Sequence, residues 1–561
     1  MDFTTTLGIA SVADGSEMTG GGELIVSGDG AVPTDVRDIR HVIVQAGGRG
    51  SRLEHYSWNK PKCLVPVDGK PLIYDLFDSF PNARFTVILD HKAEVFERFI
   101  QEFKPAVPVT FVRSQGTGTC SGIRLAMEHL PDEDTPFLLV WSDLKFDRVP
   151  GGRIGDRLLV GLTDGFSCRW SWSPAGGLAP VPSGEAGVMG MFGVPGRRVL
   201  SGLPDSGEFV RWLSEAALPI DVAFVEGARE YGTLAALHAH WAGSAHARFF
   251  NDVRIRDDRV EKRTRTPRFA HLIEREAAWY RKMEQVGFRH APALLAEHPL
   301  TLERLHGEHP CDLPAEPAEQ RRILERIMLA LEDLHGRERR PANAEAADAL
   351  YRTKTLERLQ TVRRLLPELT ARESLRVNGV PCRNILHDRH RGWFEKLVDG
   401  LVGEPVGGLA ALGSSLPGGG GAHGRFTLIH GDPTFSNILV DKTGKPWFID
   451  PRGSFGGIDL FGDPRYDWAK LYYSVVGDYD SFNRKQFLLQ ITGDGAEIEI
   501  RENGWSHLRG LFQERLAADL PAIRLIHALV WLSLSGYVED DYDSIVGAYV
   551  RGLQVLNEAA A

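Results

Sequence analysis

The sequence predicts an α/β protein in two parts: a doubly wound, mostly parallel sheet in the first half and a bilobal α+β domain in the second. Four short apolar runs alternate with helical periodicity in the first half, which is typical of a parallel sheet covered by helices. These runs are residues 41–44, 85–89, 109–112 and 137–141. In the second half, a hairpin pattern over 251–263 precedes a long, mainly helical region.

Chain length and composition predict the domain boundaries. A chain of 561 residues is longer than one hydrophobic core usually extends, so at least two domains are expected. We expect a flexible tail, a first domain, a small lobe and a large lobe, in that order: residues 1–38, 39–243, about 244–306 and about 307–561. The tail is rich in Gly, Ser, Thr and Asp and offers too little apolar surface to offset the entropy lost on ordering. The two lobes form the second domain, 244–561, with a Gly- and Pro-rich loop at 400–424.

Helical periodicity predicts the main helices. In the first half, Ile123, Met127 and Leu130 recur at helical spacing between two predicted strands. In the second half, helical patterns occupy residues 272–286, 318–375, 467–475, 505–535 and 542–558. One apolar stripe within these patterns is formed by Ile323, Ile327, Leu331 and Leu334.

Composition and charge restrict the possible functions. The chain is 43% hydrophobic and carries a net charge of -10, so broad binding to nucleic acid or to an anionic membrane is not expected. It lacks an apolar run of the roughly 20 residues that a membrane span requires, and it lacks a signal peptide pattern. Five scattered cysteines without C-x-x-C spacing indicate a reducing compartment and no structural zinc. We therefore expect a cytoplasmic protein that acts on small molecules, and a homo-oligomer is compatible with this composition.

A glycine-rich loop with basic neighbours follows the first predicted strand. It reads Gln45-Ala-Gly-Gly-Arg-Gly-Ser-Arg-Leu53, and Asn59-Lys-Pro-Lys62 and Pro66-Val-Asp-Gly-Lys-Pro-Leu72 come after it. Glycines let backbone N–H groups approach a phosphate, and basic side chains neutralise its charge. In a doubly wound sheet, this loop and Asp143 both lie just past strand ends, where ligands bind. The motif therefore predicts a nucleotide phosphate site.

Over about residues 40–240, these motifs resemble the sugar-1-phosphate nucleotidylyltransferases and cytidylyltransferases. The resemblance implies a Rossmann-like domain in which a phosphomonoester attacks the α-phosphorus of CTP or UTP and releases pyrophosphate. It implies that Lys62 and Arg52 stabilise the charge on the phosphates and that Asp143 holds Mg²⁺. It also implies nucleotide contacts for Gly47, Gly48, Gly50, Ser51, Gln115 and Gly118.

The first half departs from this family at one metal ligand. The family has a second metal-binding Asp in an Asp-x-Gly-Thr sequence, where this chain reads Glu230-Tyr-Gly-Thr233. Glu binds Mg²⁺ with a longer arm, so Glu230 is the expected ligand, with Asp221 and Glu226 as substitutes. The alternative for the whole loop is a dinucleotide site, but the G-x-G-x-x-G register is missing.

The second half contains an ordered set of polar residues between short strands. An apolar strand runs into His430-Gly-Asp432, and Asn437 and Asp450 follow it. Phosphoryl transfer from ATP needs a carboxylate to accept the hydroxyl proton and oxygen ligands to hold Mg²⁺. Protein kinases use Asp, four spacer residues, Asn and a later Asp in this order. We therefore expect Asp432 to be the catalytic base and Asn437 and Asp450 to be metal ligands; the alternative is a polar turn between two hairpin strands.

This stretch resembles the aminoglycoside phosphotransferase and choline kinase family, which implies a protein-kinase-like fold and ATP as phosphoryl donor. Lys262 shares a strand face with Val260, which turns it inward under the nucleotide. Glu276 matches the family's helix Glu that holds this lysine. The resemblance further implies an adenine-binding hinge at 300–307, a structural role for His335 and a bracing role for Asp467. The family's Asp-Phe/Trp-Gly is here Asp450-Pro-Arg-Gly, which leaves the next turn undefined.

Together the halves predict a bifunctional enzyme that phosphorylates a sugar, polyol or amino alcohol and then activates the product with CTP or UTP. Such NDP-activated groups feed capsule and cell-surface polysaccharides. Alternatives are a choline or ethanolamine pathway, an antibiotic-inactivating kinase, a salvage pair for a cell-wall amino sugar, and a kinase with a nucleotide-sensing first half. Trp141, Trp170 and Trp172 fit a quaternary ammonium cage or a sugar-stacking surface, but ordinary core packing also explains them, and we favour a sugar or polyol phosphate as the substrate.

Overall fold

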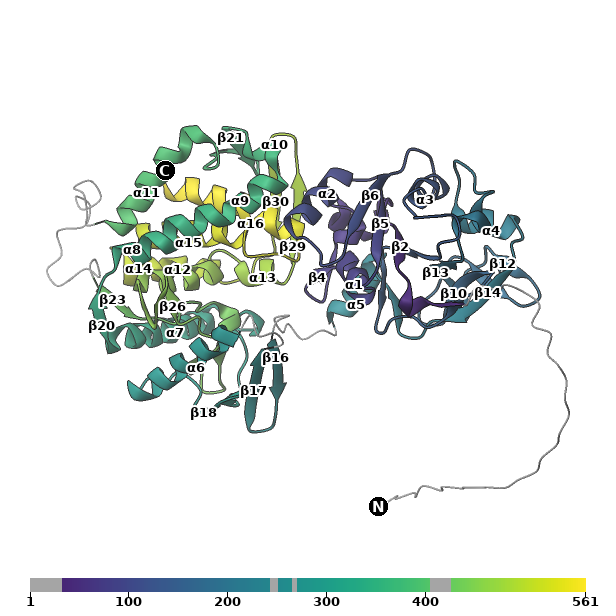
Figure 1. Cartoon of the computed structure of the whole chain (residues 1–561). Coiled ribbons are helices and arrows are strands. Elements are labelled where there is room, and N and C mark those ends of the chain that lie inside the picture. The colour runs from purple at the N-terminus through teal and green to yellow at the C-terminus, as the bar shows by residue number, and fades with distance from the viewer. Residues whose placement is uncertain (1–32, 243–250, 265–269, 404–424) are drawn as a thin grey trace, which may run out of the picture.

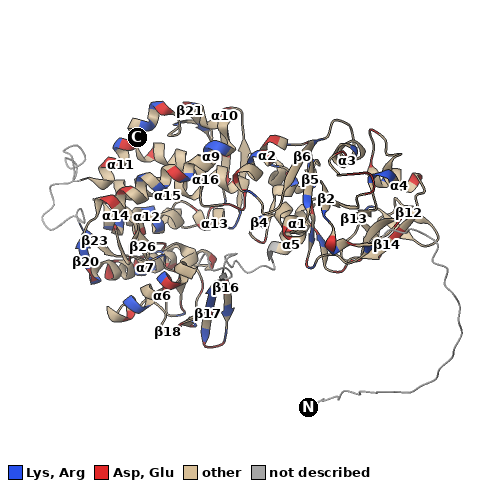
Figure 2. Cartoon of the chain, viewed as in Figure 1, with Lys and Arg blue, Asp and Glu red and all other residues tan. Residues whose placement is uncertain are grey.

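The computed structural model describes residues 33–242, 251–264, 270–403 and 425–561. Figure 1 shows a first domain beside a large helical lobe, with the smaller lobe that carries α6 (Ala270–Gln285) below the large lobe. Acidic and basic positions are interspersed along the helices of both domains (Figure 2). Within the described residues, none of the helices combines the length and apolar character that crossing a bilayer requires.

The first domain is built on a mixed, mainly parallel sheet. Its strands lie in the order β6 (Val109–Arg113), β5 (Arg84–Leu89), β2 (His41–Gln45), β7 (Phe137–Trp141), β13 (Gly187–Val194), β10 (Leu158–Thr163) and β14 (Ile220–Phe224). The short strands β11 (Ser171–Ser173) and β12 (Gly177–Ala179) also belong to this sheet, and β11 pairs with β13. β2 pairs in parallel with both β5 and β7, and β13 is antiparallel to β7 and to β10. All four predicted strands are present, and the fold class is confirmed.

Helices cover both faces of this sheet. They are α1 (Leu72–Ser79), α2 (Ala93–Glu102), α3 (Cys120–Met127), α4 (Phe209–Glu215) and α5 (Leu234–Ala242). Alternate residues of β2 belong to different cores: Val42 and Val44 pack in one cluster, and Ile43 packs with Ile123 of α3 in another. Both faces are apolar because each is buried, as expected for a doubly wound sheet.

The predicted tail extends too far. Residues 34–38 form β1 (Thr34–Asp35) and a 3₁₀ turn, and β1 pairs with β9 (Arg153–Ile154). Val36 is fully buried, and its N–H donates to the carbonyl of Gly152 at 3.0 Å. One apolar side chain in a polar stretch thus attaches this segment to the domain. The rest of the predicted tail lies outside the described residues.

The small lobe is an antiparallel sheet with one helix. Its strands follow the order β16 (Asn251–Ile255), β17 (Arg259–Thr264), β19 (Leu300–Glu303) and β18 (Leu294–Glu297). β16 and β17 form the predicted hairpin, and α6 contacts β17 and β18. This arrangement places a buried face of β17 against α6.

The large lobe is mainly helical. Its principal helices are α7 (Pro317–Arg337), α9 (Lys354–Leu365), α11 (Asp388–Val402), α12 (Pro464–Val475), α15 (Leu520–Leu534) and α16 (Tyr542–Ala559). The hairpin β29 (Phe487–Ile491) and β30 (Gly495–Ile500) was not predicted. The expected loop at 400–424 begins too early, because residues 400–402 still belong to α11. Its residues 404–424 lie outside the described residues.

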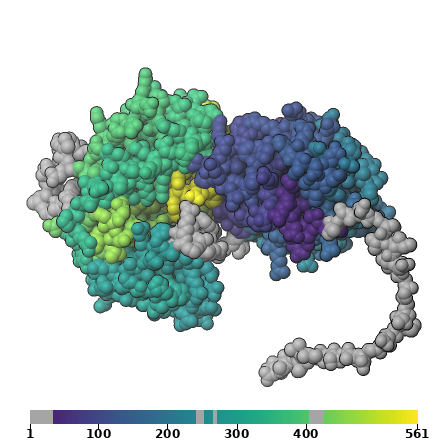
Figure 3. Space-filling model, in the orientation of Figure 1, coloured from purple at the N-terminus to yellow at the C-terminus, as the bar shows by residue number. Residues whose placement is uncertain are grey.

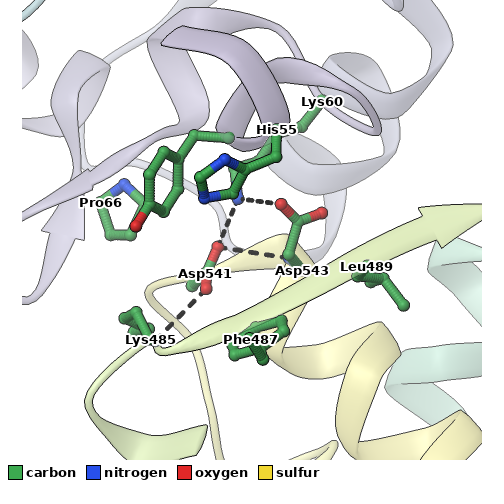
Figure 4. Close-up of a pocket in the computed structure, with 9 residues that line it drawn as sticks. His55, Lys60, Pro66, Lys485, Phe487, Leu489, Asp541 and Asp543 are labelled. Atoms are coloured by element: carbon green, nitrogen blue, oxygen red, sulfur yellow. Dashed lines mark hydrogen bonds and ion pairs between the residues drawn. The ribbon is translucent and has the colours of Figure 1, made fainter. Parts of the chain in front are cut away.

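The first domain contacts the large lobe directly, and the space-filling view shows its purple and blue atoms against the yellow end of the chain (Figure 3). Asn59 continues the edge of β29: its side chain donates to the carbonyl of Leu489 and accepts from the N–H of Ile491. Lys60 lies between Asp541 and Asp543 of the large lobe (Figure 4). The Asn-Lys-Pro-Lys motif therefore belongs both to the first domain's loop and to the contact between the domains.

Candidate active sites

The glycine-rich loop of the first domain wraps around Lys62. Gly50 has a φ of +65°, a conformation that favours glycine, and a Cβ there would lie 3.1 Å from the Cβ of Lys62. The hydroxyl of Ser57 donates to the carbonyl of Gly50 at 2.9 Å. A Cβ at Gly48 would lie 3.6 Å from the Cε of Lys62. The loop thus brings its backbone next to the predicted catalytic lysine.

Two carboxylates meet beside this lysine. Glu230 ends β15 (Ala228–Glu230) and pairs with Leu144 of β8 (Leu144–Phe146), so it lies next to Asp143. A Cβ at Gly232 would lie 2.3 Å from Glu230 Oε1 and 2.6 Å from Asp143 Oδ2, so both oxygens line the same small space. Burial, and next the charge of Asp143, raise the pKa of Glu230. This repulsion is what a bound divalent cation relieves.

Each carboxylate also has a basic partner. Lys62 Nζ lies 2.8 Å from Asp143 Oδ2, and an Arg52 guanidinium nitrogen lies 3.6 Å from Glu230 Oε1. Burial alone raises the pKa of Asp143, but the nearby Lys62 ammonium outweighs it and the pKa is lowered. Asp143 is therefore a buried, ionised carboxylate. Carboxylate oxygens are the groups that Mg²⁺ prefers, so Asp143 and Glu230 together fit that ion.

The substitutes considered for Glu230 lie elsewhere. Asp221 is on β14 opposite Leu159, and it is half-exposed and 3.7 Å from Arg157. Glu226 is exposed in the turn that precedes β15. Of the three acids, Glu230 is the one that adjoins Asp143.

The other predicted nucleotide contacts surround the same edge of the sheet. Gly118 has a φ of +84°, and a Cβ there would lie 2.3 Å from the carbonyl oxygen of Gly207. The close approach of the Gly207 backbone therefore explains why position 118 is a glycine, whether or not a ribose binds there. Gln115 and Ser51 are exposed, and a Cβ at Gly47 would lie 3.1 Å from the Cβ of Asp90. Their contacts with nucleotide remain predictions.

The catalytic loop of the second domain is held by Asp467 of α12. The carboxylate of Asp467 accepts from the N–H of His430 and from that of Gly431, each at 2.8 Å. His335 Nε2 lies 3.1 Å from the same carboxylate. The side-chain amide of Asn437 donates to the carbonyl of Asp432 at 2.8 Å, which turns its oxygen away from that carbonyl. This network fixes the positions of both predicted site residues.

A hairpin brings the second predicted metal ligand of this domain next to the first. β24 (Ile438–Val440) pairs with β25 (Pro446–Phe448), and the N–H of Ile449 donates to the carbonyl of Asn437 at 3.0 Å. Ile449 therefore lies opposite Asn437, and Asp450 is the next residue. One amide oxygen and one carboxylate fit Mg²⁺ once phosphate oxygens complete its coordination. Among the described residues, no group of three or more His, Cys, Asp or Glu side chains could hold a metal ion.

Lys262 lies buried beneath this hairpin. Its ammonium is 2.7 Å from Glu276 Oε1 and also contacts Asp450 Oδ1. Burial alone lowers the pKa of Lys262, but Asp450 and Glu276 outweigh it and the pKa is raised. The lysine is therefore a permanent cation between the two lobes.

Both halves of the sequence match known families. The family model described as MobA-like NTP transferase domain matches residues 42–147, and the model of the phosphotransferase enzyme family matches residues 237–499. The chain joins a nucleotidyltransferase domain to a phosphotransferase domain.

Curated relatives match the nucleotidyltransferase domain. UTP–glucose-1-phosphate uridylyltransferase AglF of Haloferax volcanii is 30% identical over 108 residues, which are 19% of this chain and 44% of the relative. Mannose-1-phosphate guanyltransferases of Yarrowia lipolytica (31% identical; 19% and 31% covered) and Neurospora crassa (27% identical; 18% and 30% covered) also match. The chain thus spans less than half the length of these relatives.

Solved structures match the same domain. HddC from Yersinia pseudotuberculosis has a TM-score of 0.31 and 17% identity, covering 36% of this chain and 98% of that one. The inositol-1-phosphate CTP transferase from T. maritima has a TM-score of 0.29 and 15% identity, covering 37% and 98%.

Three tryptophans of the nucleotidyltransferase domain, Trp141, Trp170 and Trp172, are partly buried and pack against its core. Trp141 contacts the rings of Phe192 and Phe209, with centroids 5.3 Å and 6.3 Å away. Trp170 and Trp172 pack against the same apolar cluster. Of the three interpretations of these residues, core packing accounts for the observed contacts.

Sequence reasoning missed two cations of the phosphotransferase site. Lys470 Nζ lies 3.0 Å from Asp432 Oδ1, and Arg452 Nε lies 3.6 Å from Asp432 Oδ2. Lys470 follows Asp467 by three residues on α12, so helical spacing alone places both on one face toward the catalytic loop. The N–H groups of Arg452 and Gly453 both donate to the carbonyl of His430, which defines the Asp-Pro-Arg-Gly turn.

Proposed function

We propose that the protein is a bifunctional enzyme. Its phosphotransferase domain moves the γ-phosphoryl group of ATP to a hydroxyl of a small metabolite. Its nucleotidyltransferase domain then joins the resulting phosphomonoester to CTP or UTP and releases pyrophosphate. The observation that carries this proposal is that one chain holds two separate groups of polar side chains, Asp143 with Glu230 and Asp432 with Asn437 and Asp450, each beside basic residues.

In the phosphotransferase domain, Asp432 accepts the proton of the attacking hydroxyl. Lys262 neutralises the α- and β-phosphates, and Glu276 holds its ammonium in place. Asn437 and Asp450 would hold Mg²⁺, which supplies charge neutralisation on the phosphates. Because Asp467 fixes two backbone N–H groups of the loop, the base is preorganised for the hydroxyl.

In the nucleotidyltransferase domain, an oxygen of the phosphomonoester attacks the α-phosphorus. Lys62 and Arg52 neutralise the charge that develops there, while the glycine loop orients the triphosphate. Asp143 and Glu230 would hold Mg²⁺. The reaction needs positioning and charge neutralisation more than it needs a strong base.

A sugar 1-phosphate is the proposed intermediate, since the curated relatives are named for glucose 1-phosphate and mannose 1-phosphate. The product is then an NDP-activated sugar for cell-surface polysaccharide made in the cytoplasm. The packed tryptophans give no support to a choline-type route. The Asp143–Glu230 pair supports a catalytic first domain over a nucleotide sensor.

Two substitutions test the proposal reciprocally. Asp432→Asn is expected to stop ATP-dependent phosphorylation and to leave pyrophosphate release from a supplied sugar 1-phosphate intact. Lys62→Met is expected to do the reverse. Each retained activity reports that the variant is folded. The two-site proposal is wrong if either substitution abolishes both activities in folded protein, or if no NTP yields pyrophosphate with any sugar 1-phosphate.

A further inference from the structure

Four cationic side chains form a group at the predicted base Asp432. Lys470 and Arg452 contact its two oxygens, Lys354 of α9 lies near them, and Arg358 of α9 adjoins Lys354 and Arg452. The group therefore joins three separate parts of the large lobe: α9, α12 and the turn after Asp450. We call these four residues the cation cluster.

Tyr537 ties two members of the cluster together. A guanidinium nitrogen of Arg452 donates to the Tyr537 hydroxyl at 3.2 Å. The guanidinium carbons of Arg452 and Arg358 lie 5.2 Å and 5.1 Å from the centroid of the same ring. Arg358 is further held by a 3.0 Å bond to the carbonyl of Ser533. The Tyr537 ring thus holds the guanidinium groups of Arg452 and Arg358 near each other.

Lys354 is the least compensated member of the cluster. It lies one helical turn before Arg358 on α9, and within the described residues its ammonium makes no hydrogen bond or ion pair. Burial, together with the charges of Arg358, Lys470 and Arg452, lowers its pKa to about 7; Asp432 offsets only part of this. A second negative group beside these side chains would relieve the repulsion.

The nearby acids are already engaged. Asp463 binds Arg465 at 2.7 Å, and Asp467 accepts from the catalytic loop. Asp480 accepts from the N–H of Ser436 at 2.9 Å. Asp432 is therefore the carboxylate that faces the cluster, and it balances one of four charges.

The geometry points to an anion subsite for the phosphoryl acceptor: we propose that the cation cluster binds a phosphate or carboxylate group on the metabolite whose hydroxyl Asp432 deprotonates. The inference rests on the proposed phosphotransferase function. The hydroxyl oxygen forms a bond to the γ-phosphorus, the bond from that phosphorus to the β,γ-bridging oxygen breaks, and the proton passes to Asp432. The acceptor is thus an anionic alcohol, such as a sugar phosphate or a sugar acid.

The position of α9 favours the acceptor over the nucleotide. The nucleotide phosphates are expected at Lys262 and Asp450, between the lobes. Lys354 and Arg358 belong to α9 of the large lobe, whereas Lys262 belongs to β17 of the small lobe. A polycationic aminoglycoside or a quaternary ammonium alcohol would meet repulsion here.

The test compares matched alcohols as acceptors, with ADP release as the readout. The panel pairs glucose 6-phosphate and glucuronate with neutral glucose and methyl glucuronate, and adds choline and kanamycin as cations. We expect turnover with anionic members, and preference for glucose 6-phosphate or for glucuronate distinguishes phosphate from carboxylate. Faster turnover of neutral or cationic members would overturn the anion subsite and leave the phosphotransferase proposal standing.

Variants then locate the subsite. Arg358→Met and Lys354→Met should each raise the KM of an anionic acceptor about 10- to 100-fold, as expected for a lost charge-assisted hydrogen bond. The KM of ATP should stay within about twofold, and pyrophosphate release by the other domain reports folding. Lys396→Met, at an exposed lysine of α11, is the matched control. An increase confined to the KM of ATP would instead assign the cluster to the nucleotide.

A binding measurement covers the case in which no panel member reacts. Inorganic phosphate is titrated calorimetrically into the full chain saturated with Mg²⁺ and a non-hydrolysable ATP analogue. Wild type should bind one more phosphate than Arg358→Met, because the nucleotidyltransferase site is the same in both. Equal binding by the two proteins refutes the anion subsite, and failure to bind the ATP analogue refutes the phosphotransferase proposal itself.

Discussion

Lys60 of the nucleotidyltransferase domain and Asp541 of the phosphotransferase domain form a buried ion pair, with the ammonium 2.6 Å from the carboxylate. A second carboxylate, Asp543, lies 2.7 Å from the same ammonium (Figure 4). Lys60 is two residues before Lys62, so a catalytic loop of one domain is anchored in the other domain. Burial alone lowers the pKa of Lys60, but the two acids outweigh it and the pKa is raised.

Lys60→Met should therefore impair nucleotidyl transfer as well as stability. Removing one partner of a buried pair typically costs about 3–5 kcal/mol, because the remaining charge stays buried without compensation. We expect a Tm several degrees lower and a reduced rate of pyrophosphate release, since the loop before Lys62 loses its anchor. Calorimetry and a coupled pyrophosphate assay measure the two effects. Lys104→Met, at an exposed lysine of the same domain, should change neither. An unchanged rate would show that Lys62 is positioned without help from the large lobe.

Asp467→Asn should slow phosphoryl transfer without weakening ATP binding. An amide offers one acceptor oxygen where the carboxylate offers two, so the N–H of His430 or of Gly431 loses its partner. Hydrogen bonds to a charged group contribute about 1.5–3 kcal/mol, which corresponds to a fall in kcat of about 10- to 100-fold. Steady-state kinetics with ATP varied separates kcat from KM. A normal kcat would show that the loop holds its shape without this brace.

The two catalytic centres differ in how far the sequence alone could define them. Asp432, Asn437 and Asp450 have fixed spacing on one short segment, so local strand pairing brings them together. Glu230 is 87 residues beyond Asp143, and only the pairing of β15 with β8 shows that the two are adjacent. Predicted site roles remain predictions, although the fold class is confirmed.

Longer-range contacts could not be predicted from the sequence. Lys354 comes from a distant segment, and its approach to Asp432 depends on how α9 packs in the large lobe. Lys60 looked like part of a phosphate motif, and its partners are 481 and 483 residues away. Val36 lies in a polar stretch of the sequence, and its burial depends on a contact with Gly152, which is far away in the chain.

The anion subsite predicts a characteristic pH dependence. Lys354 has a pKa lowered to about 7, and Arg358, Arg452, Lys470 and Asp432 are the charged groups that face it. Its positive charge is present below this pH and is lost above it, so kcat/KM for an anionic acceptor should fall as the pH rises from 6 to 8. Lys354→Arg should remove this fall, because a guanidinium stays charged throughout. An identical profile in the variant would exclude Lys354 as the titrating group.

Glu230→Gln should weaken metal-dependent nucleotidyl transfer. The substitution removes a charge that adjoins Asp143 and pairs with Arg52, so fewer negative groups are left for Mg²⁺. We expect the Mg²⁺ concentration for half-maximal pyrophosphate release to rise, and kcat to fall by about 10-fold or more, as for other losses of electrostatic stabilisation. Glu230→Asp keeps the charge on a shorter arm and should retain more activity than the amide. Phosphorylation by the other domain serves as the internal control. If the Gln variant shows the wild-type dependence on Mg²⁺, then Asp143 binds the metal without Glu230.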